Sequence, residues 1–244
     1  MDVHSPKPWH GLREFAKEIG TIVIGVLIAL GAEAVVEKLH EQRLSKEARE
    51  AVRAEIALDL ANVQRRAQWQ PCIDRRLAQL SDVLAKAERG EPFEPVRIIG
   101  NPGTPLIATQ RWEAATAGGR TSLLDLGEQR DFARVYVELR SLFPQEVAEA
   151  ASWADLMAIE GVAHPSPELL ARAQVALAHA RLDNWTVRNT IRQTVSFAAR
   201  MGIKPTPNDL VVIGDQADRE LLCLPLDTPP AEAASRVRDP LGIF

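Results

Sequence analysis

Cysteine is scarce in this chain, because Cys72 and Cys223 are the only two among 244 residues. Two thiols are too few for a framework of disulfides or for a cysteine-rich zinc site. In an exported domain the two would pair and close a loop of about 150 residues, whereas in the cytoplasm they would stay reduced. The sequence leaves this pairing open.

Metal-ligand spacing is also missing. The histidines are scattered, and none has another histidine or a cysteine at the spacing of a zinc site. They are His4, His10, His40, His164 and His179. We therefore expect no metal ion and no cofactor.

Signatures of common catalytic sites are absent too. The sequence contains no HExxH, GxSxG, CxxC or Walker-type GxxxxGK motif. The glycines of residues 100–105 are not followed by the lysine and helix that cradle a phosphate group. No Lys/Arg-rich run with interleaved aromatics occurs, and the net charge is −4, so a nucleic-acid partner is not expected. No residue is a candidate for catalysis, and we do not expect an enzyme.

Against these absences, one long apolar run stands out. Residues 19–36 read IGTIVIGVLIALGAEAVV, with Glu33 as their only charged residue. The hydrocarbon core of a bilayer, about 30 Å thick, takes roughly 20 apolar helical residues, with about 17 as the minimum. The run predicts a transmembrane helix that follows a tail of residues 1–18 and anchors the chain in the lipid bilayer.

Two other interpretations of the run stay open. Ala32-Glu33-Ala34 resembles a signal-peptidase site, so the run could be the core of a cleaved signal peptide. The acidic residues before the run, and the lack of a helix breaker after Gly31, argue against cleavage. The third interpretation is a buried helix of a soluble protein, but Ile22–Leu30 is apolar all round and would need cover on every face.

A row of small residues lies within the run at four-residue spacing. It consists of Thr21, Gly25 and Ala29, and Glu33 continues it. Such a row lets two membrane helices approach closely, which favours self-association. Gly is also common in membrane helices generally, which explains the row without a partner. Glu33 lies about one turn from the end of the run, so we expect it to reach the headgroup region. The alternative is a functional carboxylate within the membrane.

The flanking charges give only a weak indication of orientation. Basic residues lie on both sides of the run, and those after it alternate with glutamates. Because long domains translocate largely regardless of charge, we expect the N-terminus inside and the large domain in the periplasm. Arginine far exceeds lysine and alanine is abundant, a composition typical of GC-rich bacterial genomes. The expected location is therefore the bacterial inner membrane.

The chain after the run has a helical pattern. From Glu37 to Trp69 it contains no Gly or Pro and carries one apolar stripe, which predicts a stalk helix continuous with the membrane span. Pro71 begins a second helix that ends at Gly90. Residues 91–105, rich in Pro and Gly, form a linker. A short helix then runs from an N-cap at Thr109 to the Gly118-Gly119 pair.

Longer helices are predicted next. An apolar stripe from Phe132 to Phe143 predicts a helix that Pro144 ends, and a separate helix covers Gln145–Glu160. Ser166-Pro167-Glu168 begins a last helix, which ends at Gly202 and carries the 3,4 spacing of a bundle seam. Asn184 lies in this seam, either as a polar residue that sets the register or as one that faces solvent or caps a neighbour. Since this helix and the stalk are nearly equal in length, we expect them to lie side by side.

These elements define an all-α fold class. A transmembrane helix continues into a long stalk, which packs in an antiparallel helical bundle over residues 37–202. Residues 203–244, with six prolines and one β-like run at Leu210–Ile213, form an irregular tail draped on the surface.

One constellation is a candidate ligand pocket. Trp112 and Glu113 lie between Arg111 and Arg120, next to the Gly-Gly turn, and together could bind a small anion or polar molecule. The alternative is that the tryptophan packs in the core while the charges face water. Other helical carboxylates, such as Glu146 and Glu149, are interleaved with arginines and suggest solvent-exposed faces.

Two segments resemble a group of uncharacterised bacterial membrane proteins. The first is FAKEIGTIVIGVLIALGAEAVVE, which is similar to that group's E-x-x-x-I-V-I-G-V-L-I-A-L type span. The second is Trp112-Glu113-Ala114-Ala115, followed by Gly118-Gly119-Arg120 and Leu123-Leu124, which resembles a W-E-x-A…S-G-x-L block. The resemblance implies a single-span anchor with a helical domain. It implies no activity and no site residues.

The leading hypothesis is a membrane-anchored helical interaction or scaffold module, whose partner is another protein or a second copy of the chain. The alternative is a periplasmic ligand-sensing or ligand-binding domain, because helical bundles on one span can hold small molecules between helices. Such a sensor would need a partner for output, because the N-terminal tail is too short for an output domain. An enzyme of unrecognised type is the third hypothesis.

Overall fold

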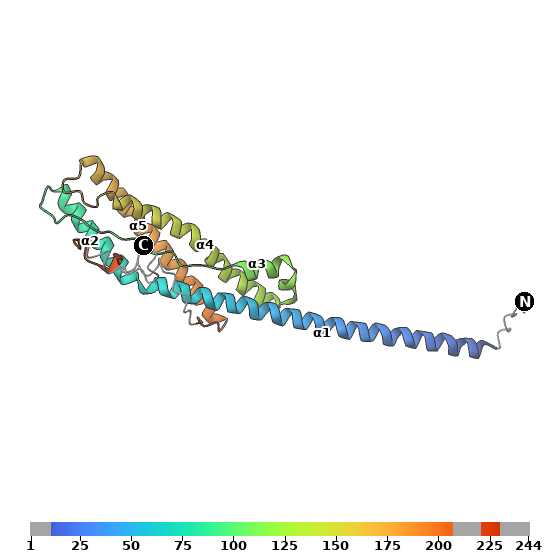
Figure 1. Ribbon diagram of the computed structural model, residues 1–244. Coiled ribbons are helices and arrows are strands. Elements are labelled where there is room, and N and C mark those ends of the chain that lie inside the picture. The colour runs from blue at the N-terminus through green and yellow to red at the C-terminus, as the bar shows by residue number, and fades with distance from the viewer. Residues whose placement is uncertain (1–10, 207–220, 230–244) are drawn as a thin grey trace, which may run out of the picture.

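The computed structural model describes residues 11–206 and 221–229, and its regular elements there are all helical (Figure 1). They are α1 (Gly11–Gln68), α2 (Gln70–Glu88), α3 (Gln110–Ala117), the 3-10 helix η1 (Arg120–Leu123), α4 (Leu126–Met157) and α5 (Pro167–Arg200). The all-α prediction is confirmed. The β-like run at 210–213 and residues 1–10 lie outside the described residues.

Helix α1 contains the predicted span and the predicted stalk in one element of 58 residues. It begins at Gly11 and so includes the last part of the predicted tail. Its first half projects from the bundle as a straight rod (Figure 1). Residues 21–43 are all exposed, and Ala48 is the first buried residue. The chain therefore leaves the apolar part of α1 uncovered and packs only against its C-terminal third.

The corner between α1 and α2 is built by proline and tryptophan. Pro71 lies in the first turn of α2, where its missing N–H would have no helical partner anyway. Trp69 occupies the corner with its side chain buried, and its backbone N–H donates to the carbonyl of Arg66 at 3.1 Å. The predicted break before this proline is confirmed.

Helix α4 corrects one prediction, because Pro144 does not end it. The helix runs through Pro144 for 32 residues in all. Pro144 is exposed, so its ring faces solvent, while Leu142 and Glu146 on either side are buried. Proline removes one hydrogen bond of the helix and clashes with the preceding turn. Packing on both sides of the proline offsets that cost.

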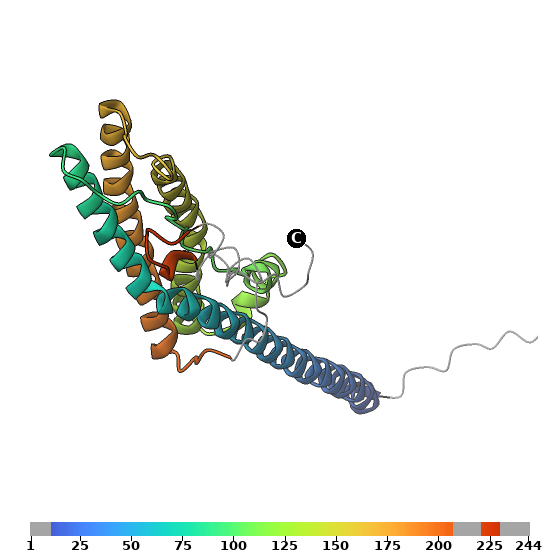
Figure 2. The same cartoon turned by 60° about the vertical axis from the view of Figure 1, so that its left-hand side comes forward.

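Helix α5 begins as predicted. The hydroxyl of its N-cap, Ser166, accepts the N–H of Leu169 at 3.2 Å, and Pro167 follows in the first turn. Its main partner is α4 (Figure 2), and it meets α1 over a shorter stretch. The expectation that α5 and the stalk lie side by side therefore holds only over that stretch. Residues 158–166 return the chain so that α5 packs mainly along α4.

The buried apolar residues form two cores. The proximal core, nearer the membrane segment, joins the end of α1 to α3, the first half of α4 and the second half of α5; it includes Val52, Ile56, Leu60, Phe132, Leu139 and Val187. The distal core joins α2, the linker, the end of α4 and the start of α5; it includes Ile73, Leu80, Leu84, Trp153, Leu177 and Leu222. Helices α4 and α5 pass through both.

The second described part of the tail, residues 221–229, is more than a surface cover, and we call it the strap. Leu222 is buried in the distal core. The carbonyl of Leu226 accepts the N–H groups of Arg97 and Ile98 in the linker, at 2.7 and 3.3 Å. Cys223 is joined to Cys72 of α2 by a disulfide. The strap is thus fixed to both α2 and the linker.

Candidate functional site

The residues of the predicted ligand pocket do not form a common site, because one of them is buried in the core and the others are exposed. The ring of Trp112 belongs to the proximal core, where it stacks on Tyr136 with ring centroids 5.1 Å apart and lies 6.2 Å from Phe132. Glu113 faces outward, where it accepts the Thr109 hydroxyl at 2.8 Å and lies 3.3 Å from the guanidinium of Arg140.

The two arginines of that constellation are exposed. Arg111 lies in the first turn of α3, and Arg120 begins η1 after the left-handed Gly119. The ring of Trp112 thus belongs to the core, whereas Arg111, Glu113 and Arg120 are exposed to solvent. None of the four lines the surface groove described below.

A buried polar row on α1 is the most unusual feature of the bundle. Its members, Glu55, Asp59, Asn62 and Arg66, follow one another at steps of four, three and four residues and are all buried. The same spacing marks an apolar seam, so the row occupies a face that normally carries leucine or alanine. Polar groups at such depth require partners, because burial without hydrogen bonds is costly.

Glu55 fixes α3 to α1. Its carboxylate accepts the backbone N–H groups of Arg111 and Trp112, at 2.8 and 3.2 Å, and the hydroxyl of Tyr136 at 2.6 Å. The two N–H groups belong to the first turn of α3, whose dipole favours a negative charge there. Burial and the Glu55 carboxylate together raise the pKa of Tyr136 well above its ordinary value, so the hydroxyl keeps its proton.

Asp59 and Asn62 hold the chain just before α3. The Oδ1 atom of Asp59 accepts the N–H of Ala108 at 2.9 Å, and the Nδ2 of Asn62 donates to the carbonyl of Leu106 at 2.6 Å. The Oδ2 atom of Asp59 has no hydrogen-bond partner among the described residues, although the side chain is fully buried. Burial raises the pKa of Asp59 to about 7.

Arg66 ends the row in a buried ion pair with Glu149 of α4. Its Nη2 atom lies 2.9 and 2.8 Å from the two carboxylate oxygens. Burial raises the pKa of Glu149, against the opposing effect of Arg66. Glu146 and Glu149 are both buried, so the prediction that they belong to solvent-exposed faces is wrong. The arginine that pairs with Glu149 comes from α1 and not from α4 itself.

Further polar contacts lie beside this ion pair, between the two cores. Asn184 of α5 is buried and accepts from Gln70 at 3.0 Å, while Ser152 donates to Asp183 at 2.6 Å. Asn184 therefore contacts the start of α2 and does not face solvent. The ion pair and these contacts form a polar layer that fixes the register of α1, α2, α4 and α5.

Arg76 ties down the strap next to the disulfide. Its buried guanidinium donates to the carbonyls of Ile98, Leu221, Leu222 and Leu224, at 2.5 to 3.1 Å. Burial lowers the pKa of this arginine to about 10, so it keeps its charge at neutral pH. These contacts leave the guanidinium engaged by carbonyl groups of the chain, which indicates a structural role.

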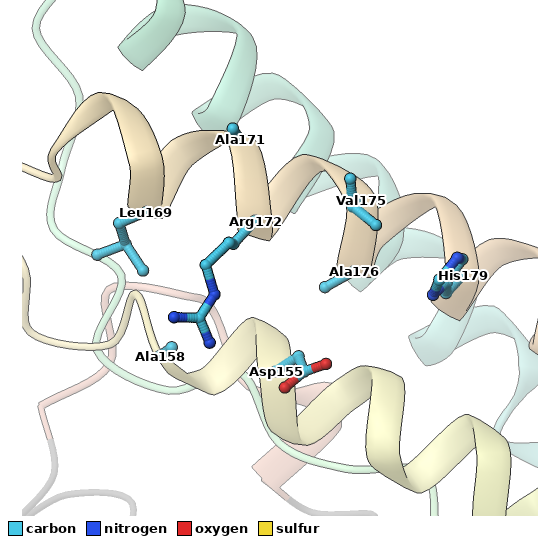
Figure 3. A pocket seen from close by; sticks show the side chains of 8 residues that line it. All are labelled: Asp155, Ala158, Leu169, Ala171, Arg172, Val175, Ala176 and His179. Carbon is cyan, nitrogen blue, oxygen red and sulfur yellow. The ribbon is translucent and has the colours of Figure 1, made fainter.

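A surface groove of about 360 Å³ lies between the end of α4 and the start of α5 (Figure 3). Its floor and sides are mostly small or aliphatic; the lining residues are Asp155, Ala158, Leu169, Ala171, Arg172, Val175, Ala176 and His179. Figure 3 shows the Arg172 side chain reaching from α5 toward α4, with Asp155 and His179 farther along the groove. No sequence pattern predicts this groove, because each of its lining residues is ordinary on a helix surface.

The residues of the predicted membrane span lie on the exposed half of α1. Gly25, Ala29 and Glu33 are all exposed, and the hydroxyl of Thr21 donates to the Lys17 carbonyl one turn earlier at 2.9 Å. Among the described residues, this stretch is the one helical segment long and apolar enough to cross a membrane, and none of it is buried against the chain.

The described residues contain no cluster of three histidine, cysteine or carboxylate side chains placed to bind a metal ion. Comparison of the chain with protein-family models, curated proteins and solved structures gives no match. The family resemblance of the two sequence segments therefore stays a prediction.

Proposed function

We propose that this protein is a membrane-anchored helical interaction module, held in a bacterial inner membrane by α1 with its bundle in the periplasm. The observation that carries the proposal is the uncovered apolar half of α1. Exposed leucines and isoleucines in a continuous band are unfavourable in water and favourable in lipid.

Helical continuity supports retention of this segment. A cleavage after Ala34 would cut α1 near its middle and leave a bundle that begins on a free helix end. A buried-helix interpretation lacks a covering element, since the described residues leave the whole apolar window exposed. Lipid is the cover that matches the composition of the helix.

The disulfide supports a periplasmic bundle. Structural disulfides form and persist in the periplasm and are rare in the bacterial cytoplasm. Cys72 and Cys223 lie within disulfide geometry on α2 and the strap, so the bundle fits an oxidising compartment.

Topology is tested by reporter fusions at the C-terminus. A periplasmic bundle predicts active alkaline phosphatase and a dark green fluorescent protein when each is fused after residue 244. A control fusion after residue 18, before the span, should show the opposite pattern. A fluorescent C-terminal fusion would contradict the proposed orientation, and a soluble, shortened product would support cleavage.

Self-association is the proposed interaction, through the row of Thr21, Gly25 and Ala29. Small residues there let two α1 helices pack closely in the bilayer. Gly25→Ile would separate the helices and should lower chemical crosslinking in membranes several-fold. Leu27→Ile, about 200° around the helix from Gly25, is the matched control. If crosslinking of the wild-type protein gave only monomers, and no other protein copurified with it, the proposed interaction module would be contradicted.

A second candidate function, ligand binding, rests on the groove between α4 and α5. The guanidinium of Arg172 could hold a carboxylate over the alanine floor, and Asp155, farther along the groove, an amine. Thermal shift of the purified protein with amino acids and short-chain carboxylates tests this candidate. Arg172→Ala should abolish any shift, and the exposed Arg134→Ala should not.

A further inference from the structure

The neighbourhood of Asp59 is built around a buried carboxyl group that lacks a cation. The groups that face it are Glu55 on the same helix and Tyr136 of α4, with Arg111 of α3 at the exposed rim. The segment packed over it, residues 105–109, has no titratable side chain. Any negative charge on Asp59 would therefore lie one turn from the Glu55 carboxylate without an ion-pair partner.

The hydrogen bonds divide unequally between these two carboxyl groups. Glu55 accepts three donors, whereas Asp59 accepts a single N–H, that of Ala108. A buried carboxylate with one donor is poorly compensated, and a neutral carboxyl group suits such a site better. Both groups hold the same unit, residues 105–117, against α1.

We propose that Asp59 is a proton-operated latch: its neutral carboxyl group holds residues 105–117 on α1, and its ionisation releases them. Release admits water to the unpartnered Oδ2 atom. It breaks the bond from Ala108 to Asp59, the bond from Asn62 to Leu106, and the bonds from the Arg111 and Trp112 amides to Glu55. The unit is small, because α3 is short and packs on α1 and η1, and its release would withdraw Trp112 and Ala115 from the proximal core.

The sign of the pH dependence follows from the raised pKa of Asp59, about 7 when the latch is closed. The closed form binds the proton more tightly than the open form, whose carboxyl group titrates near the ordinary value of about 3.9. The contribution of Asp59 to the stability of the closed latch is therefore fully present at pH values below its ordinary pKa. This contribution is lost as the pH rises to the closed-state pKa, and a further rise in pH changes the stability of the latch no more.

Hydrogen exchange of the full-length protein in detergent tests the latch. After correction for intrinsic exchange, protection of the Ala108, Arg111 and Trp112 amides should fall about tenfold per pH unit between pH of about 5 and 7. It should level off above that range. Amides in the middle of α5 should keep their protection, because the opening is local.

Asp59→Asn separates the latch from other pH effects. Asparagine keeps the oxygen that accepts from Ala108 but cannot ionise, so protection should stay high at every pH. Glu50→Gln, an exposed carboxylate on the same helix, should behave like the wild type. Wild-type protection independent of pH, or an Asp59→Asn profile that falls as the wild type does, would overturn the proposal.

A direct titration of Asp59 in the wild-type protein tests the latch even if the Asp59→Asn variant does not fold. The carboxyl carbon of Asp59, followed by NMR in the wild type, should titrate well above the ordinary value, with a midpoint between that value and the closed-state pKa of about 7. A midpoint near the ordinary value of about 3.9 would overturn the latch. Because both experiments use the purified chain, their outcome does not depend on membrane orientation.

Discussion

Buried charges dominate this bundle at the scale of single residues. Arg66 and Glu149 are almost fully buried, and each is the other's counter-charge. Such a pair adds little net stability compared with apolar residues, yet removal of one partner strands the other charge. The pair therefore serves mainly to fix the register of α1 against α4.

Glu149→Gln tests that role. The free energy of unfolding should fall by about 3–5 kcal/mol, because Arg66 keeps its charge without a carboxylate partner. Chemical denaturation in detergent, followed by circular dichroism, measures the change.

Two further variants control this experiment. Glu113→Gln, in the exposed pair with Arg140, should change stability by less than about 1 kcal/mol. The double variant Arg66→Met with Glu149→Leu should recover much of the loss, since no charge is left buried. A Glu149→Gln variant as mild as Glu113→Gln would disprove the buried-charge account.

At the scale of elements, the strap is placed by the close approach of two backbones. Gly100 in the linker has a φ of 75°, and a Cβ atom there would lie 2.9 Å from both the Cα and the N of Leu222. Only a residue without a side chain allows the linker and the strap to pass at this distance.

Gly100→Ala should therefore loosen the strap. We expect about 1–3 kcal/mol of destabilisation and faster reduction of the Cys72–Cys223 disulfide by dithiothreitol. Gly90→Ala is the matched control, because Gly90 has a similar φ of 67° but open space around it. Equal effects of the two variants would show that φ alone, and not the contact with Leu222, limits this position.

Pro144 shows why element boundaries were only partly predictable. The sequence around Pro144 predicted a helix end that the structure does not have, whereas the same kind of signal at Pro71 correctly predicted a helix break. The difference is tertiary, because α4 has buried contacts with α5 on both sides of Pro144, whereas the chain turns a corner at Trp69. Local signals carry no information about such support.

At the scale of the whole molecule, the disulfide ties together segments that are 151 residues apart. Such a link lowers the entropy of the unfolded chain, and the effect grows with loop length. The double variant Cys72→Ser with Cys223→Ser should lose about 3–5 kcal/mol of stability.

Thermal unfolding with and without reductant checks this value. Reductant should bring the wild type down to the melting temperature of the double variant and leave the double variant unchanged. A reductant-insensitive wild type would show that the two thiols are not paired in the folded protein.

The membrane-like segment, the helix starts at Ser166 and Pro71, and the all-α class follow from the sequence alone. These depend on composition, periodicity and capping, which neighbouring residues determine. The sequence also placed Trp112 in a constellation with three charged residues, but left open whether the ring was buried. Packing against Tyr136 and Phe132 decided that it belongs to the core.

Only the tertiary structure decided which charges are inside. Glu55, Asp59, Asn62 and Arg66 look like ordinary polar positions of a stalk helix, because their partners lie 44 to 83 residues away in the chain. Whether a carboxylate faces water or a backbone N–H depends on which segment folds over it, and that information is not local. The apolar half of α1 was thus predictable from the sequence, whereas burial of the polar row on its other half was decided by the tertiary structure.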